Sequence, residues 1–309
     1  MSLDLSKYLV VGISSRALFN LEHENKIFQT KGVKEYSKWQ IKNQNKILKP
    51  GTGFPLVEAI LNLNGKAPKD RKTEVIIMSR NNAETGLRIC NSIKHYRLDI
   101  QRSAWTSGTC VTPYLQPFKV HLFLSADEED VQTAIRAGIA AARIYPYTFN
   151  RDRLKEPIGQ IRIAFDGDAV LFSDEAENIY KTKGMKAFLK HETENAKKPL
   201  PEGPFAKLLK TLSSLQSKYS SGNMPVRTAL ITARNMPAHE RVIRTLMAWN
   251  VRIDESFFMG GVDKHEILRA FKPHIFFDDQ DVYCAKASKV VPTAIVSRAN
   301  NRKKRRKKR

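Results

Sequence analysis

An internal repeat constrains the fold of this 309-residue chain more than any other feature of its sequence. Short blocks of sequence recur about 150 residues later in nearly the same register. The matching pairs are residues 30–34 with 182–186 and 17–19 with 169–171, both at a step of 152, 79–81 with 233–235 at 154, and 118–123 with 271–276 at 153. Because one register holds across blocks that lie far apart, we predict a tandem duplication of one structural unit.

The repeat divides the chain into two expected domains and a tail. The first unit covers residues 1–145, the second covers 146–296, and a basic tail follows over 297–309. This length agrees with two domains, since a domain commonly holds ~100–200 residues. Prolines and a glycine between residues 145 and 160 mark the junction.

Alternating strand and helix patterns predict an α/β fold. Each unit begins with a short apolar run, residues 8–13 in the first and Ile161–Phe165 in the second, that is typical of a buried strand. In the second unit we expect further strands at residues 229–231, 257–259 and 274–277, and helices at 238–249 and 264–271. This alternation is typical of a parallel sheet with helices on both faces, which binds ligands beyond the carboxyl ends of its strands.

A helical insert follows the first strand of the second unit. It covers about residues 174–223, and we expect it to cap the strand ends and to contact the ligand. Tyr180, Phe188 and Phe205 lie within it and belong either to its core or to a surface that stacks on a base. The sequence leaves this choice open.

Polar side chains follow four predicted strands of the second unit. They are Asp166-Gly167-Asp168, Thr232-Ala233, Lys264 and Asp278-Asp279. Taken singly, these residues also fit a turn, a helix cap and a solvated lysine, whereas a calcium loop fits poorly because Val170 replaces an oxygen ligand. Taken together, they supply a carboxylate to attack phosphorus, a second carboxylate to move protons, and groups that hold phosphate and a hard cation.

The order aspartate pair, threonine, lysine, aspartate pair resembles the haloacid dehalogenase superfamily of phosphatases. Within that superfamily, the sequence is similar to the cytosolic 5′-nucleotidase type I family through residues 14–19, 165–175 and 273–280, and the likeness extends over about residues 8–296. The resemblance implies a Rossmann-like, haloacid-dehalogenase-like unit with a helical cap in each half, of which the second half is catalytic. It also implies hydrolysis of nucleoside 5′-monophosphates to nucleoside and phosphate.

The resemblance also implies roles for individual residues. Asp166 would be the nucleophile that forms an aspartyl-phosphate, and Asp168 the general acid and base. Thr232, Ala233 and Lys264 would bind the phosphoryl group. The implied cofactor is Mg²⁺, held by Asp166, by the backbone carbonyl of Asp168 and by Asp278, with Asp279 in support.

The first unit lacks these groups at the matching places. We align Ser14 and Arg16 with the first aspartate pair, Met78 with Thr232, Val111 with Lys264, and Ser125-Ala126 with Asp278-Asp279. Two interpretations remain open. The first unit is either a scaffold for the catalytic unit or a second anion site, formed by Ser14, Ser15, Arg16, Arg80 and Asn81.

The formal net charge of +22 does not identify the partner. Eight of these charges form the run of residues 302–309, which is expected to be a solvated end with weak nucleic-acid contact as the alternative. The remaining excess suits any anionic ligand. Cys90, Cys110 and Cys284 show neither zinc nor disulfide spacing, and no apolar run approaches the ~18 residues of a membrane span, so we expect a cytoplasmic protein with reduced thiols.

Two rival functions remain open at this point. One is a phosphatase or phosphotransferase that acts on another small phosphate monoester. The other, from a different class, is a nucleic-acid-binding protein with a vestigial phosphatase fold, which the positive charge allows. The sequence does not determine the preferred base or sugar, or the oligomeric state.

Overall fold

The computed structural model describes residues 4–65, 71–146, 160–217, 219 and 224–297. Most of the predicted junction between the units, and the basic tail from residue 298 onward, lie outside these described residues. The helices are η1 (Leu5–Lys7), α1 (Ser15–Leu18), α2 (Glu22–Lys42), α3 (Phe54–Leu61), α4 (Ala83–His95), α5 (Thr112–Leu115), α6 (Glu128–Arg136), α7 (Glu175–Glu194), α8 (Ala206–Gln216), α9 (His239–Ala248), α10 (His265–Phe271) and α11 (Asp281–Ala287). The strands are β1 (Leu9–Ile13), β2 (Thr73–Ser79), β3 (Arg102–Trp105), β4 (Leu122–Ser125), β5 (Ala140–Ile144), β6 (Ile161–Phe165), β7 (Val226–Thr232), β8 (Glu255–Phe258), β9 (Ile275–Asp278) and β10 (Thr293–Ile295).

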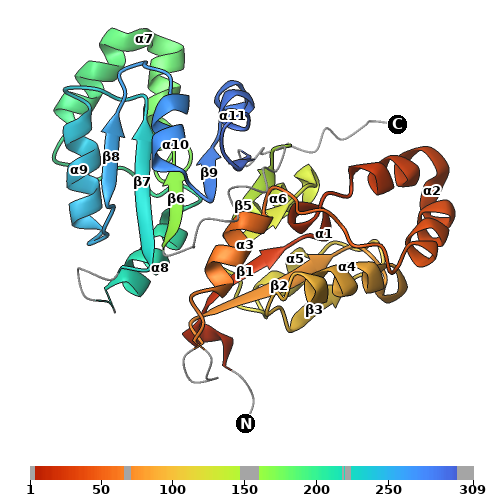
Figure 1. Ribbon diagram of the computed structural model, residues 1–309. Coiled ribbons are helices and arrows are strands. Elements are labelled where there is room, and N and C mark those ends of the chain that lie inside the picture. The colour runs from red at the N-terminus through yellow and green to blue at the C-terminus, as the bar shows by residue number, and fades with distance from the viewer. Residues whose placement is uncertain (1–3, 66–70, 147–159, 218, 220–223, 298–309) are drawn as a thin grey trace.

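The strands form one 10-stranded sheet in the order β3-β2-β1-β4-β5-β10-β9-β6-β7-β8. The predicted α/β class is confirmed, but the sheet is mixed rather than wholly parallel. Among the described strands, all pairs within each half are parallel, and the halves meet in one antiparallel pair, in which Ala294 and Ile295 of β10 lie opposite Ile144 and Arg143 of β5. The two halves of the chain therefore lie side by side and share one continuous sheet (Figure 1).

The two halves repeat one strand order. Counted from its outer edge, the first half reads β3-β2-β1-β4-β5 and the second reads β8-β7-β6-β9-β10. Local details repeat as well: α2 and α7 are each broken by a glycine with φ of 78°, Gly32 and Gly184. At the start of the first strand of each half, a backbone N–H donates to the Nδ1 of a histidine, His121 or His274.

Two sequence alignments between the halves were wrong by one residue. In β2 the last residue is Ser79, whose Oγ accepts from the N–H two residues on, as the Oγ1 of Thr232 does at the end of β7. Ser79, and not Met78, therefore corresponds to Thr232. Likewise Phe19 corresponds to Phe172, because each forms an antiparallel β-bridge with the loop before the next helix.

The core follows from the alternation of side chains along buried strands. On one face of the sheet, residues such as Val11 and Phe165 belong to a single apolar cluster that extends through both halves. On the other face, Val10 packs in a cluster of the first half and Ala164 in a separate cluster of the second. The continuous cluster packs the halves together along one face.

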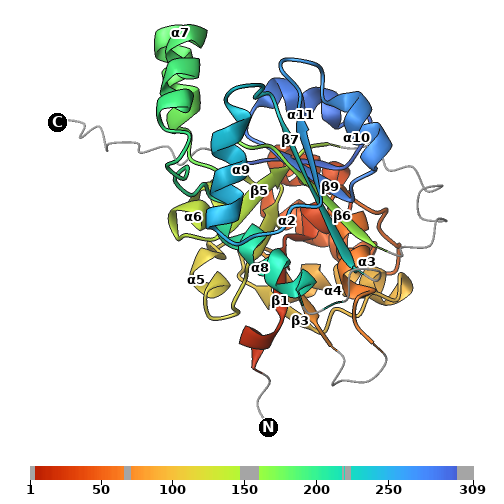
Figure 2. The ribbon, with the colours of Figure 1, turned by 90° about the vertical axis from the view of Figure 1, so that its left-hand side faces the viewer.

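The structure places the two helices of the predicted cap differently. Helix α7 lies beyond the carboxyl ends of β6 and β7, and α2 lies at the corresponding end of the first half (Figure 1). Figure 2 shows α7 extending away from the sheet. Helix α8 instead packs on the sheet, because its leucines belong to the continuous core and Gln216 donates to the carbonyl of Val226 at the start of β7. The leucine spacing that suggested a cap helix reflects this burial.

The remaining expected elements of the second half are confirmed within a few residues at their ends. In the part of the chain that the structure describes, no helix is long and apolar enough to cross a membrane.

Candidate active site

The end of β6 positions Asp166. Its N–H donates to the carbonyl of Phe277 at 2.8 Å, as the last ladder contact with β9. The chain then turns sharply, and the carbonyl of Gly167 accepts from the N–H groups of Leu171 and Phe172 at 2.9 and 3.0 Å. A side chain at position 167 would place its Cβ only 3.2 Å from the Oγ1 of Thr232, so glycine allows the two strand ends to approach closely.

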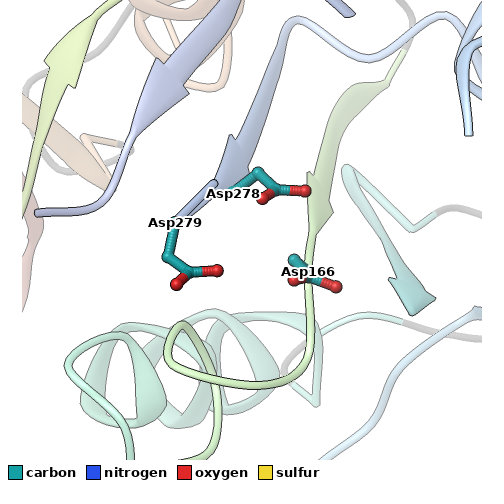
Figure 3. A group of neighbouring side chains, drawn as sticks. All are labelled: Asp166, Asp278 and Asp279. Atoms are coloured by element: carbon teal, nitrogen blue, oxygen red, sulfur yellow. The ribbon is translucent and has the colours of Figure 1, made fainter. Parts of the chain in front are cut away.

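Three carboxylates converge at this edge of the sheet. Asp166, Asp278 and Asp279 each place an oxygen within 4.8 Å of the other two, and the three side chains face a common space (Figure 3). Asp166 is 5% exposed and Asp278 is 0% exposed. Adjacent parallel strands β6 and β9 bring these acids together from positions more than a hundred residues apart.

Lys264 forms ion pairs with two of these acids. Its Nζ is 2.9 Å from the Oδ1 of Asp166 and 2.7 Å from the Oδ2 of Asp278, and the residue is 3% exposed. Burial disfavours its charge, but the two carboxylates outweigh this cost and raise the pKa of Lys264. Burial raises the pKa of Asp166 and Asp278, with Lys264 opposing the shift.

The donor set fits a hard divalent cation. Three acids lie together and one ammonium group pairs with two of them, so the cluster carries an excess of negative charge in a buried place, which is costly without further positive charge. All the donors are oxygens, and Mg²⁺ prefers a few carboxylates together with phosphate and water. Asp166, Asp278 and Asp279 are therefore the residues that could hold it.

Thr232 ends β7 next to this cluster. It is buried, and its Oγ1 accepts from the N–H of Arg234 at 3.2 Å. Ala233 follows directly on the turn that leaves the strand. The structure thus brings the second-half residues that the sequence singled out to one edge of the sheet.

Sequence reasoning missed a buried ion network behind Asp168. The guanidinium of Arg234 donates to both carboxylate oxygens of Asp168, at 2.8 and 2.7 Å, and also pairs with Glu192 of α7. Arg241 donates to the other oxygen of Glu192 at 2.8 Å. Burial would raise the pKa of Glu192, but the two arginines outweigh it and lower that pKa. The sequence signal that could have revealed this network is Arg234 itself, which follows Thr232 by two residues.

The aromatic residues of the insert separate into two groups. Phe205 is fully buried and its ring centroid lies 4.7 Å from that of Phe277, so it belongs to the core. Phe188 packs edge-on against Tyr180, and its ring lies under the guanidinium of Arg234 at 5.4 Å. Of the three, only Tyr180 is well exposed.

The first half contains a cavity where the second half has its acids. Its volume is about 450 Å³. The residues of the candidate second anion site all line it: Ser14, Ser15, Arg16, Arg80 and Asn81.

A family model described as 5′-nucleotidase matches residues 1–303. The chain belongs to the 5′-nucleotidase family. It is similar to human (Homo sapiens) cytosolic 5′-nucleotidase 1B, with 38% identity over 284 residues, which cover 88% of this chain and 46% of that protein. The chain thus spans about half the length of this relative. No solved structure matches it significantly. Membership of the 5′-nucleotidase family agrees with the resemblance stated from the strand-end residues.

Proposed function

We propose that this chain hydrolyses nucleoside 5′-monophosphates to nucleoside and phosphate, with Mg²⁺, in its second half. The observation that carries the proposal is the buried cluster of Asp166, Lys264, Asp278 and Asp279 at one sheet edge. Membership of the 5′-nucleotidase family supports the substrate class. The name of the human relative supports a cytosolic location.

In the first step, a carboxylate oxygen of Asp166 attacks phosphorus and forms an aspartyl-phosphate. The bond from phosphorus to the ribose oxygen breaks, and Asp168 donates a proton to that oxygen. In the second step, Asp168 accepts a proton from water, which attacks the same phosphorus and releases inorganic phosphate and the Asp166 carboxylate. Arg234 holds both oxygens of Asp168, so proton donation requires one of these hydrogen bonds to open.

The other residues position and neutralise the phosphoryl group. Lys264 lies within hydrogen-bond distance of Asp166 and so beside the attacked phosphorus. The hydroxyl of Thr232 and the N–H of Ala233 would hold phosphoryl oxygens. Asp166 and Asp278, with the carbonyl of Asp168 and support from Asp279, would hold Mg²⁺, which supplies positive charge as the phosphoryl oxygens become more negative.

We also propose that the two halves arose by tandem duplication and that α7 forms the cap of the catalytic half. The shared strand order, the glycine breaks in α2 and α7 and the matching histidine contacts support the duplication. The ion pair between Glu192 of α7 and Arg234 supports the cap, because it ties that helix to Asp168.

A phosphate-release assay tests the proposal. Purified chain is incubated with a panel of nucleoside 5′-monophosphates and sugar phosphates, with Mg²⁺ or with excess chelator. We expect release from one or more nucleoside monophosphates and loss of release with chelator. Turnover of sugar phosphates alone would show that sugar phosphates, and not nucleoside monophosphates, are the substrates. Turnover by metal-stripped protein would refute the metal assignment. No turnover of any monoester would refute the enzymatic proposal and favour nucleic-acid binding.

A further inference from the structure

We propose that the cavity of the first half binds an intact nucleoside phosphate that the chain does not hydrolyse there. The cavity is formed by the carboxyl ends of β1, β2 and β4 together with α2, which is the place corresponding to the catalytic site of the second half. Its volume of about 450 Å³ lies within the range of small-molecule sites, ~300–1,000 Å³.

Unsatisfied donors point to an anionic ligand. Arg16 Nε and Asn81 Nδ2 are buried atoms that find no hydrogen-bond partner in the described part of the chain. Both residues line the cavity, and so do the hydroxyl-bearing Ser14, Ser15 and Ser79. A buried donor without a partner costs about 1–3 kcal/mol, so a ligand that offers acceptor oxygens would recover that cost.

The acids of the cavity do not cancel this donor excess, because protein groups already bond to them. Glu24 accepts from Arg88 at 2.6 Å, and Asp130 accepts from Arg80 at 2.9 and 2.6 Å. Asp127 accepts from the N–H of Asp130 at the start of α6. Arg16 also pairs with Glu22 at 2.9 Å, so its Nε and the Nδ2 of Asn81 are the donors left to bind a phosphate.

An aromatic wall suits a planar base. Phe28 and Tyr36 of α2 line the cavity, and their rings pack edge-on at 5.8 Å. Phe28 is 46% exposed, so one side of its ring can receive another planar group. The hydroxyl of Tyr36 donates to Asn81 and so joins this wall to the polar end of the cavity.

The same positions cannot perform the proposed hydrolysis. Ser14 stands in place of Asp166, Ser125 in place of Asp278, and the apolar Val111 in place of Lys264. This set has no carboxylate to attack phosphorus, no acid pair for a metal and no ammonium group. A nucleotide bound here would remain intact.

Binding of AMP to the Asp166→Asn chain tests the inference, because we expect this variant to hydrolyse AMP too slowly to consume it during a titration. Isothermal titration calorimetry with Mg²⁺ should give two AMP sites per chain, and the added substitutions Arg16→Ala and Asn81→Ala should remove one. Arg269→Ala, which removes an exposed arginine that is also ion-paired, is the matched control and should leave both sites. If both substitutions leave every AMP site unchanged, the inference is wrong.

Phe28→Ala provides a second test in case the double variant fails to fold. Phe28 is half exposed and outside the core, so its removal should not disturb the fold. It should weaken the second site about tenfold and leave kcat unchanged, whereas Tyr180→Ala, the corresponding change in α7, should not alter that site. Unchanged affinity in Phe28→Ala would overturn the base contact. Adenosine should bind this site more weakly than AMP, and equal affinity would overturn the phosphate contact.

The calorimetry separates this inference from the proposed function. If the second half does not bind nucleotides, a single AMP site should remain and should disappear with Arg16→Ala and Asn81→Ala. That result would refute the nucleotidase proposal and support the cavity of the first half.

Discussion

The two halves of this molecule have the same strand order but carry different chemistry at the same strand ends. In the second half, Asp166, Asp278 and Lys264 form a buried charged cluster. The first half has Ser14, Ser125 and Val111 at these places, so no such cluster forms there. Because buried charges are costly, the comparison indicates that this fold does not need them at these strand ends, which agrees with their proposed role in catalysis.

The ion network shows the same contrast. In the second half, Asp168, Arg234, Glu192 and Arg241 form a chain of buried ion pairs. Asn81 and Gln40 replace Arg234 and Glu192 in the first half, where Tyr36 bridges them through neutral hydrogen bonds. The residue at the position of Arg234 is thus charged in the second half, where it holds the proposed acid and base. The matching residue of the first half, Asn81, is neutral and lines the cavity.

The largest expected difference between the halves concerns the nucleophile. Asp166→Asn keeps the shape of the side chain but removes the attacking carboxylate, so kcat for a nucleoside monophosphate should fall by roughly 10³-fold or more. Ser14→Ala, at the corresponding place, should leave kcat within about tenfold. Steady-state phosphate release measures both variants, and similar losses in the two would contradict the assignment of one catalytic half.

The second largest effect concerns proton transfer. Asp168→Asn should lower kcat by about 10²–10⁴-fold, because the amide can neither donate to the leaving oxygen nor deprotonate water. Arg16→Asn is the counterpart in the first half and should change kcat little. A substrate with a better leaving group should lose less of its rate in Asp168→Asn. An equal loss for every leaving group would contradict the acid role.

A smaller effect is expected from the buried network. Glu192→Gln should destabilise the fold by roughly 3 kcal/mol, since it leaves Arg234 and Arg241 without their shared counter-charge. It should also lower kcat, because Arg234 holds Asp168. Glu24→Gln, which removes the buried partner of Arg88, should reduce stability without lowering kcat. Denaturant unfolding and kcat together test this, and equal kcat values in the two variants would contradict the link to Asp168.

The smallest effect concerns a histidine that both halves share. Burial lowers the pKa of His274 from 6.5 to about 4, and its Nδ1 accepts from the N–H of Arg162. As pH falls, His274 therefore binds a proton in the unfolded chain before it does so in the folded chain. The contribution of neutral His274 to the free energy of unfolding is fully present above pH ~6.5 and is lost as pH falls toward ~4. The loss by pH 5 should be roughly 1–2 kcal/mol.

Denaturant unfolding at pH 7.5 and 5 checks this effect. His274→Gln should reduce the difference in the free energy of unfolding between the two pH values. His121→Gln should act in the same direction, because burial lowers the pKa of His121 too. An unchanged dependence in both variants would contradict the account.

Much of the candidate active site could be predicted because it depends on short-range patterns. Apolar runs that end in Asp166, Thr232 and Asp278 predict parallel strands, and parallel strands bring their carboxyl ends to one edge. The structure brings these residues and Lys264 together.

Other features depend on long-range packing that no local pattern encodes. The antiparallel contact of β10 with β5 joins segments about 150 residues apart. The pairing of Glu192 with Arg234 depends on the path of α7 after its break at Gly184. Helix α8 has the leucine spacing of any amphipathic helix, so the sequence did not reveal which surface it covers.

Trapping the phosphorylated intermediate tests the central claim most directly. The wild-type chain is mixed with labelled AMP and Mg²⁺, quenched in acid, reduced with borohydride to convert any aspartyl-phosphate to homoserine, and mapped by mass spectrometry. The account predicts at most one modified site per chain, at position 166, with no modification in the first half. A phosphorylated residue in the first half, or full labelling and turnover by Asp166→Asn, would contradict it.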